Sequence, residues 1–286
     1  MKVVFTVMLV AIGVAGIGVF ANKGTQPAAS EASASESTAG ATRVPVLVEL
    51  FTSEGCSSCP PADALLSRLE KTQPIPGAEI IALSEHVDYW NRLGWRDPYS
   101  SVEFSERQNR YSNAFETDEV FTPQMIVDGR VQFVGSNESD ARKAIADAVS
   151  HPKASVMISL VSGNVPESGD SATAALSVRV EGLKQIEGGE SVDVLLAITE
   201  SGLHSNVTRG ENSGRVLNHI SVVRKLSTLG TIDAKKDKED EPFTAQPVLR
   251  LSKTWKRDSI KIVVFAQERL SRRVLAVTAL QLASRR

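Results

Sequence analysis

The sequence predicts an α/β domain followed by an all-β, sandwich-like domain. Three observations lead to this prediction. The only two cysteines, Cys56 and Cys59, stand between an apolar, strand-like run and a helix-like run. Strand-like and helix-like stretches then alternate up to about residue 151, and beyond it strand-like runs follow one another without a helical pattern. With 286 residues, 42% of them hydrophobic, the chain is long enough for two ordinary domains plus a tail.

The N-terminal segment predicts export. Lys2 precedes an uncharged apolar run that ends in Val19-Phe20-Ala21, with small residues where a signal peptidase requires them. The run also approaches the ~20 apolar residues that span a bilayer. Residues 1–21 are therefore either a signal peptide or an N-terminal membrane anchor, and both place the chain in the periplasm or outside the cell, where conditions are oxidising. Residues 22–42, rich in Ala, Ser and Glu, predict a disordered linker.

The first predicted domain covers residues 43–151. The β-rich run from Val46 to Phe51 suits a buried strand. Pro60 and Pro61 suit the first turn of a helix, which continues to Lys71. The aromatic-rich stretch from His86 to Tyr111 predicts helical or irregular structure across the top of the sheet. The remaining predicted elements are strands over 79–83, 124–127 and 130–134, a hairpin turn at Asp128-Gly129, and a helix capped by Ser136 or Asn137 that ends near Val149.

The second predicted domain covers residues 152–286. Its apolar runs are short and are separated by polar or glycine-rich segments, which is typical of a β-sandwich. The predicted strands are Ser155–Val161, Ala172–Val180, Val192–Glu200, Ser221–Leu226, Ala245–Leu251, Ile260–Gln267 and Val274–Leu280.

The cysteine pair predicts thiol–disulfide chemistry. The start of a helix carries free N–H groups and a partial positive charge, and both favour a thiolate, which is the reactive form of cysteine. Cys56 comes first and is expected to be exposed, so it is the predicted nucleophile. Cys59 lies deeper in the helix and is the predicted resolving thiol.

Several motifs resemble those of a known family. The order of elements and the Thr122-Pro123 pair resemble a thioredoxin-like domain, in which a cis-proline packs beside the cysteines. The segment ELFTSEGCSSCPPAD, from Glu49 to Asp63, resembles the opening motif of an exported thioredoxin-like family, domain of unknown function 1223. Further matching segments are His86–Trp90, Leu93–Trp95, Asp97-Pro98, Thr122–Met125, Arg209–Asn212, Leu217–His219 and Val222–Arg224. The resemblance implies that Thr122 and Pro123 border a substrate groove.

Two carboxylates and a histidine are further candidate site residues. Glu49 lies seven residues before Cys56 in the sequence. By analogy with thioredoxins, it is expected beneath the thiols, where it would accept the proton of the resolving cysteine. His86 and Asp88 fall on one side of an extended segment. They are either an acid–base pair serving the thiols or ordinary polar residues at a strand end.

Two alternatives to redox chemistry remain open. Cys56 and Cys59, together with His86, offer the ligands of a copper(I) or other soft-metal site. A purely structural disulfide in a binding protein is the other alternative, although so short a loop gains little from closure.

The favoured function is that of an exported thiol–disulfide oxidoreductase. No cofactor is implied, because the cysteines themselves cycle between dithiol and disulfide. The expected partners are protein or small-molecule thiols and disulfides. A formal net charge of −2 gives no reason to expect a nucleic-acid partner.

Overall fold

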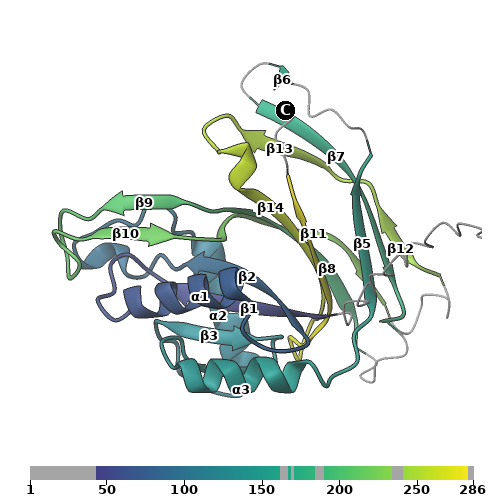
Figure 1. The fold of residues 1–286 in the computed structure, drawn as a ribbon, viewed down its shortest axis with the longest axis horizontal. Helices are drawn as coiled ribbons and strands as arrows, with labels where there is room; N and C mark the ends of the chain where they lie inside the picture. Colours follow the sequence, from purple (N-terminus) through teal and green to yellow (C-terminus); the bar gives the residue numbers. More distant parts are fainter. Residues whose placement is uncertain (1–42, 162–166, 169–170, 184–189, 234–240, 283–286) are drawn as a thin grey trace, which may run out of the picture. The chain divides into compact units, whose positions relative to one another are not determined.

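The computed structural model describes residues 43–161, 167–168, 171–183, 190–233 and 241–282 (Figure 1). The predicted signal peptide or anchor (1–21) and linker (22–42) lie outside the described residues. Among the residues that are described, no helix has the length and apolar character needed to cross a membrane.

The first part of the chain forms the predicted alternation of strands and helices. Asn137 caps its last helix, as predicted, by accepting a hydrogen bond from the backbone of Asp140. The Asp128-Gly129 turn is also confirmed, with positive φ at both residues. The elements are β1 (Val44–Thr52), α1 (Pro60–Thr72), β2 (Ala78–His86), a 3-10 turn (Asn91–Leu93), α2 (Val102–Ala114), β3 (Gln124–Val127), β4 (Val131–Val134) and α3 (Glu138–Ala148).

The second part of the described chain is built mainly of strands, with a short 3-10 turn at Arg257–Ser259. The predicted strands are present, and the sequence prediction missed a hairpin formed by β9 and β10. The strands are β5 (Ser155–Leu160), β6 (Glu167–Ser168), β7 (Ser171–Glu181), β8 (Val192–Glu200), β9 (Leu203–Asn206), β10 (Val216–His219), β11 (Val222–Ile232), β12 (Phe243–Ala245), β13 (Val248–Ser252), β14 (Ile260–Glu268) and β15 (Val274–Gln281).

A mixed eight-stranded sheet runs through both parts, in the order β15-β14-β8-β11-β2-β1-β3-β4. β1 pairs in parallel with β2 and antiparallel with β3. β2 pairs in parallel with β11 through Ser84 and Val222, and this pair joins the two parts of the chain. A smaller five-stranded sheet, built around β7, packs its apolar side chains against β8 and β14.

The predicted fold class is therefore wrong. The chain is not a thioredoxin-like α/β domain followed by an independent β-sandwich, because β8, β11, β14 and β15 continue the sheet that β1 and β2 begin. The physical reason is that the edge of β2 is paired rather than free. Strand pattern alone does not specify which edge a later strand joins.

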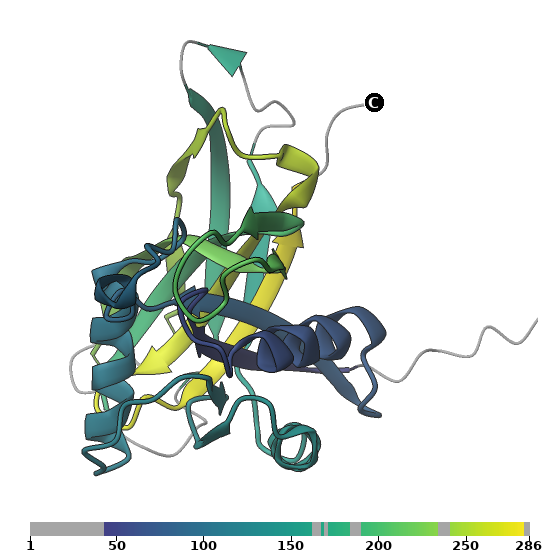
Figure 2. The same ribbon diagram turned by 90° about the vertical axis from the view of Figure 1, so that its left-hand side faces the viewer.

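Helices cover the two faces of β1 differently. Val46, Val48 and Leu50 face a core that α1 and α3 complete. Leu47 faces the opposite side, where α2 contributes Phe104 and β14 contributes side chains to another apolar cluster. Figure 2 shows α1 and α2 on opposite sides of the sheet. The Cys-x-x-Cys segment begins four residues after the end of β1, and its second cysteine is the N-cap of α1.

Candidate functional site

The two cysteines form a disulfide between the end of β1 and the start of α1. Their Cα atoms lie 5.4 Å apart. Ser57 and Ser58 between them are exposed, whereas Cys56 and Cys59 are both 0% exposed. The expectation that Cys56 is exposed is therefore wrong for the disulfide form, since neighbouring segments cover both sulfur atoms.

The start of α1 differs from the predicted anion site. Cys59 is the N-cap residue, and the next two residues, Pro60 and Pro61, have no N–H group to donate. The following N–H groups, of Ala62 and Asp63, donate to the carbonyl oxygen of Cys59. The helix therefore offers Cys56 its dipole but none of these donors.

The donor beside Cys56 is a serine hydroxyl. Ser58 Oγ lies 3.2 Å from Cys56 Sγ. A disulfide sulfur carries no proton, so the hydroxyl of Ser58 is the donor in this contact.

The Thr122–Pro123 segment lies beside the disulfide, as predicted, and its peptide bond is cis. The carbonyl oxygen of Thr122 is 3.8 Å from Cys56 Sγ. The indole N–H of Trp90 donates to the Thr122 hydroxyl at 2.8 Å. The chain thus brings together three segments that are distant in sequence around Cys56.

The loop between β9 and β10, residues 207–215, covers the disulfide segment. Asn212 is fully buried, and its side-chain amide donates to the carbonyl oxygens of Glu54 and Cys56, each at 2.9 Å. We call residues 207–215 the covering loop. Through Asn212, the covering loop is hydrogen-bonded to the backbone of Cys56 and of Glu54.

The covering loop makes a second contact through a carboxylate. Glu211 accepts a hydrogen bond from the backbone N–H of Ser57 at 2.9 Å, and the hydrogen bonds from Ser57 lower the pKa of Glu211. The carboxylate of Glu211, which is remote in sequence, therefore lies beside the exposed turn between the cysteines.

Two buried histidine–carboxylate pairs adjoin Glu54, two residues before Cys56. His219 Nε2 is 3.0 Å from Glu54 Oε1, and His86 Nδ1 is 2.7 Å from Asp97 Oδ2. The two imidazole rings meet edge to face with centroids 4.8 Å apart. Burial opposes ionisation of Asp97, but the His86 imidazole and backbone N–H groups outweigh it and lower the pKa of Asp97.

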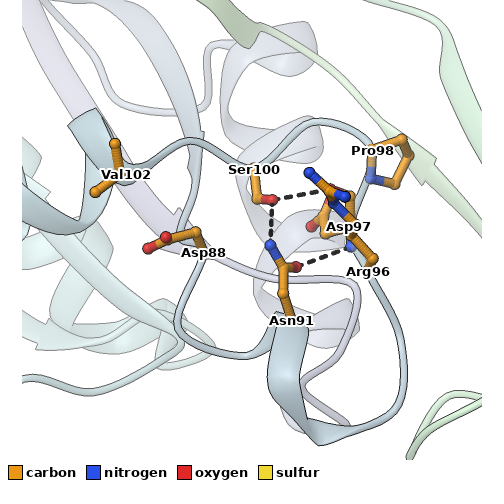
Figure 3. Close-up of a pocket in the computed structure, with 7 residues that line it drawn as sticks. All are labelled: Asp88, Asn91, Arg96, Asp97, Pro98, Ser100 and Val102. Carbon is orange, nitrogen blue, oxygen red and sulfur yellow. Dashed lines mark hydrogen bonds between the residues drawn. The ribbon is translucent and has the colours of Figure 1, made fainter.

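His86 thus pairs with Asp97 rather than with Asp88. The carboxylate of Asp88 accepts from the Ser105 hydroxyl instead. Asp88 also lines a polar pocket with Asn91, whose amide contacts the backbone of Asp97 and the side chain of Ser100 (Figure 3). The remaining residues drawn in that pocket are Arg96, Pro98 and Val102.

Glu49 lies on the other face of β1 from the core that α1 covers. Its carboxylate binds the fully buried guanidinium of Arg107, with Nε at 2.7 Å, and accepts from the hydroxyl of Tyr111. Glu85 is 3.3 Å from Arg107 and is also buried; burial raises its pKa to about 8, against the opposing effect of Arg107. Glu49 is therefore part of a buried ion-pair network, and alternation along β1 directs it away from α1.

The alternative of a metal site at Cys56, Cys59 and His86 gains no support from the described residues. In the described ranges, no three His, Cys, Asp or Glu side chains are grouped as metal ligands would be. His86 is hydrogen-bonded to Asp97 through Nδ1, and its Nε2 has no hydrogen-bond partner.

Comparison with known protein families shows to which family this chain belongs. A family model described as a protein of unknown function (DUF1223) matches residues 47–267. The chain belongs to the DUF1223 family. A comparison with curated proteins found no match.

Two solved structures resemble this DUF1223 protein over most of its length. A structural-genomics crystal structure of an Agrobacterium tumefaciens protein shares 25% identity, with a TM-score of 0.60, covering 85% of this chain and 97% of that one. HBP35 of Porphyromonas gingivalis shares 16% identity, with a TM-score of 0.54, covering 85% of this chain and 76% of that one. The latter resemblance concerns the fold alone.

Sequence reasoning missed four polar residues that surround the disulfide segment of this DUF1223 protein. Each lay within a motif quoted for the family resemblance, so position in a motif was the available signal. No spacing rule connects them, because they come from separate parts of the fold. They are Glu54, Asp97, Asn212 and His219.

Proposed function

We propose that this protein carries out thiol–disulfide exchange through Cys56 and Cys59. The observation that carries the proposal is the Cys-x-x-Cys disulfide between a strand end and a helix start, with the Thr122 carbonyl and the Ser58 hydroxyl beside Cys56. A staple closing so short a loop would contribute only about 2 kcal/mol through chain entropy. A purely structural role is therefore the weaker explanation.

Exchange proceeds through a mixed disulfide. A substrate thiolate attacks Cys56 Sγ, the Cys56–Cys59 bond breaks, and Cys59 leaves with the bonding electron pair and takes up a proton. A second substrate thiolate then displaces Cys56, so the substrate is oxidised and the cysteine pair is reduced. The same steps in reverse reduce a substrate disulfide, and no cofactor is needed.

Access to the sulfur atoms requires displacement of the covering loop. Cys56 and Cys59 are fully buried, and Asn212 bonds to the backbone of Cys56 itself. Protein and small-molecule thiols or disulfides are the proposed partners.

Trapping of a small disulfide tests the proposal and the two roles. The reduced protein, Cys56→Ser and Cys59→Ser are each incubated with oxidised glutathione, quenched in acid and weighed by intact-mass spectrometry. We expect Cys59→Ser to accumulate a glutathione adduct, Cys56→Ser to form little, and the unaltered protein to return to its internal disulfide. Ser57→Ala is the matched control, since it changes the exposed turn and keeps both thiols.

Equal trapping by both cysteine variants would contradict the assigned roles. Absence of adducts in every variant would favour a structural disulfide. The reduction potential of the pair, measured against glutathione, then gives the direction of transfer.

A further inference from the structure

We propose that Asp63 exchanges a proton with the Cys59 thiol during disulfide opening and closing, and that His219 and Glu54 support it. This inference rests on the proposed thiol–disulfide exchange. It assigns to Asp63 the role that the sequence suggested for Glu49.

Helix geometry brings Asp63 to Cys59. Asp63 follows Cys59 by one helical turn, and its backbone N–H donates to the Cys59 carbonyl at 3.1 Å. Residues four apart lie on the same side of a helix. Cys59 is fully buried, so its thiol needs a nearby group to exchange a proton with.

The carboxylate of Asp63 has the free capacity that Glu49 lacks. Its Oδ1 atom is buried and has no hydrogen-bond partner. Glu49, by contrast, is bound by Arg107 and Tyr111 on the other face of β1. Of the two carboxylates, Asp63 is the one on α1 itself.

A surface pocket connects Asp63 with His219. The pocket is lined by one side of α1 and by β10, and it opens to solvent between the exposed residues Ala64, Arg68 and Val216. His219 is only 3% exposed; its Nδ1 has no hydrogen-bond partner, while its Nε2 contacts Glu54. Asp63 and His219 thus line the same pocket, and each has one buried polar atom without a hydrogen-bond partner just beneath it.

The charged and polar groups around Asp63 come from β1, β10, α1 and the loops that follow β1 and β2. Burial raises the pKa of Asp63 to about 7; His219 and the Thr52 hydroxyl oppose this rise, and Asp97 and Glu54 add to it. Arg68, which also lines the pocket, is paired with Glu138. Asp63 therefore changes protonation near neutral pH, which suits a group that both accepts and returns a proton.

The proton moves between Cys59 and Asp63 as the internal disulfide closes or opens. In the mixed disulfide between Cys56 and a substrate, the Cys59 thiol gives its proton to the Asp63 carboxylate. The Cys59 sulfur attacks Cys56 Sγ, the internal disulfide forms, and the substrate sulfur leaves with the electron pair of the broken bond. In the opposite direction, protonated Asp63 returns the proton as Cys59 leaves.

The pH profile of mixed-disulfide resolution tests this inference. The reduced full-length chain is mixed with oxidised glutathione, and the decay of the Cys56 adduct is followed by acid quench and intact mass between pH 5.5 and 9.5. We expect resolution to accelerate as pH rises through about 7, where the Asp63 carboxylate forms.

Asp63→Asn should slow resolution roughly tenfold or more at pH 7.5. The difference should shrink above pH ~8.5, where a thiol ionises unaided. Asp147→Asn, which alters an exposed helical carboxylate in α3, is the matched control and should behave like the unaltered chain. Asp63→Glu keeps a carboxylate and should restore the acceleration, so the test survives if Asp63→Asn fails to fold.

Two results would overturn the inference. One is an Asp63→Asn protein that resolves the adduct at the unaltered rate and with the same pH profile. The other result applies if only Asp63→Glu folds. In that case, the inference fails if neither Asp63→Glu nor the unaltered chain resolves the adduct faster as pH rises through neutral values. Failure of the exchange itself looks different, because the unaltered chain would then form no glutathione adduct.

Discussion

At the scale of single residues, the buried side chain of Arg107 stands out for the number of polar groups that it binds. It is fully buried and joins Glu49, the hydroxyl of Tyr111 and the side chain of Gln267. Burial raises the pKa of the neighbouring Glu85 to about 8, and the Arg107 guanidinium opposes that rise. A buried charge left without its partner is costly, because no water replaces the lost bonds.

Arg107→Met should therefore lower the free energy of unfolding by about 3–5 kcal/mol. Denaturation in urea at pH 7 measures the change. The double variant Glu49→Gln/Arg107→Met should recover part of the loss, since it removes both charges. Arg142→Met, in an exposed pair with Glu138, is the control and should change stability little. Equal effects of Arg107→Met and Arg142→Met would contradict this account.

At the scale of elements, the covering loop is hydrogen-bonded to the disulfide segment. Its position depends on a close approach to the segment after β2. Gly210 has a positive φ of 73°, and a Cβ atom there would lie 3.3 Å from Trp95 Cβ. This approach and the Asn212 contacts together hold the covering loop against the segment that carries both cysteines.

Asn212→Ala should speed reduction of the disulfide by a small reductant such as dithiothreitol. The change removes two hydrogen bonds to the carbonyl groups of Glu54 and Cys56, worth about 1 kcal/mol each, so an increase of up to about thirtyfold is expected. The loss of protein disulfide is followed by alkylation and mass spectrometry. Ser213→Ala is the matched control, because Ser213 bonds within the loop to Thr208. If both variants are reduced as slowly as the unaltered protein, the loop does not limit access.

At the scale of the whole molecule, the two parts of the chain share cores as well as a sheet. Leu47 and Leu83 pack in one apolar cluster with Val263 and Phe265 of β14. The backbone N–H of Val274 donates to the carbonyl of Asp128 in the β3–β4 turn. Burial of the first part thus depends on strands that follow it by more than a hundred residues.

A fragment of residues 43–151 should therefore fail to fold cooperatively. It would expose the apolar face around Leu47 and Leu83 and leave the buried Arg107 without Gln267. Near-UV circular dichroism and urea denaturation, compared with residues 43–286, measure this. If the fragment unfolds cooperatively in urea, with the m value expected for its length, the first part folds without the second and this prediction is wrong.

The sequence by itself determined the local structure and the position of the cysteine pair. The apolar run of β1, the prolines that begin α1, the Asp128-Gly129 turn and the Asn137 cap each depend on neighbouring residues, and all were predictable. Membership of the DUF1223 family was also predictable, because its motifs are continuous in sequence.

Only the tertiary structure decided what surrounds that pair. The union of β2 with β11 could not be inferred, since an apolar strand is equally able to pair at several edges. The covering loop reaches Cys56 across more than 150 residues, and one-residue alternation along β1 turns Glu49 toward Arg107. Local propensities act over a few residues, whereas sheet pairing and burial depend on contacts between segments far apart in the chain.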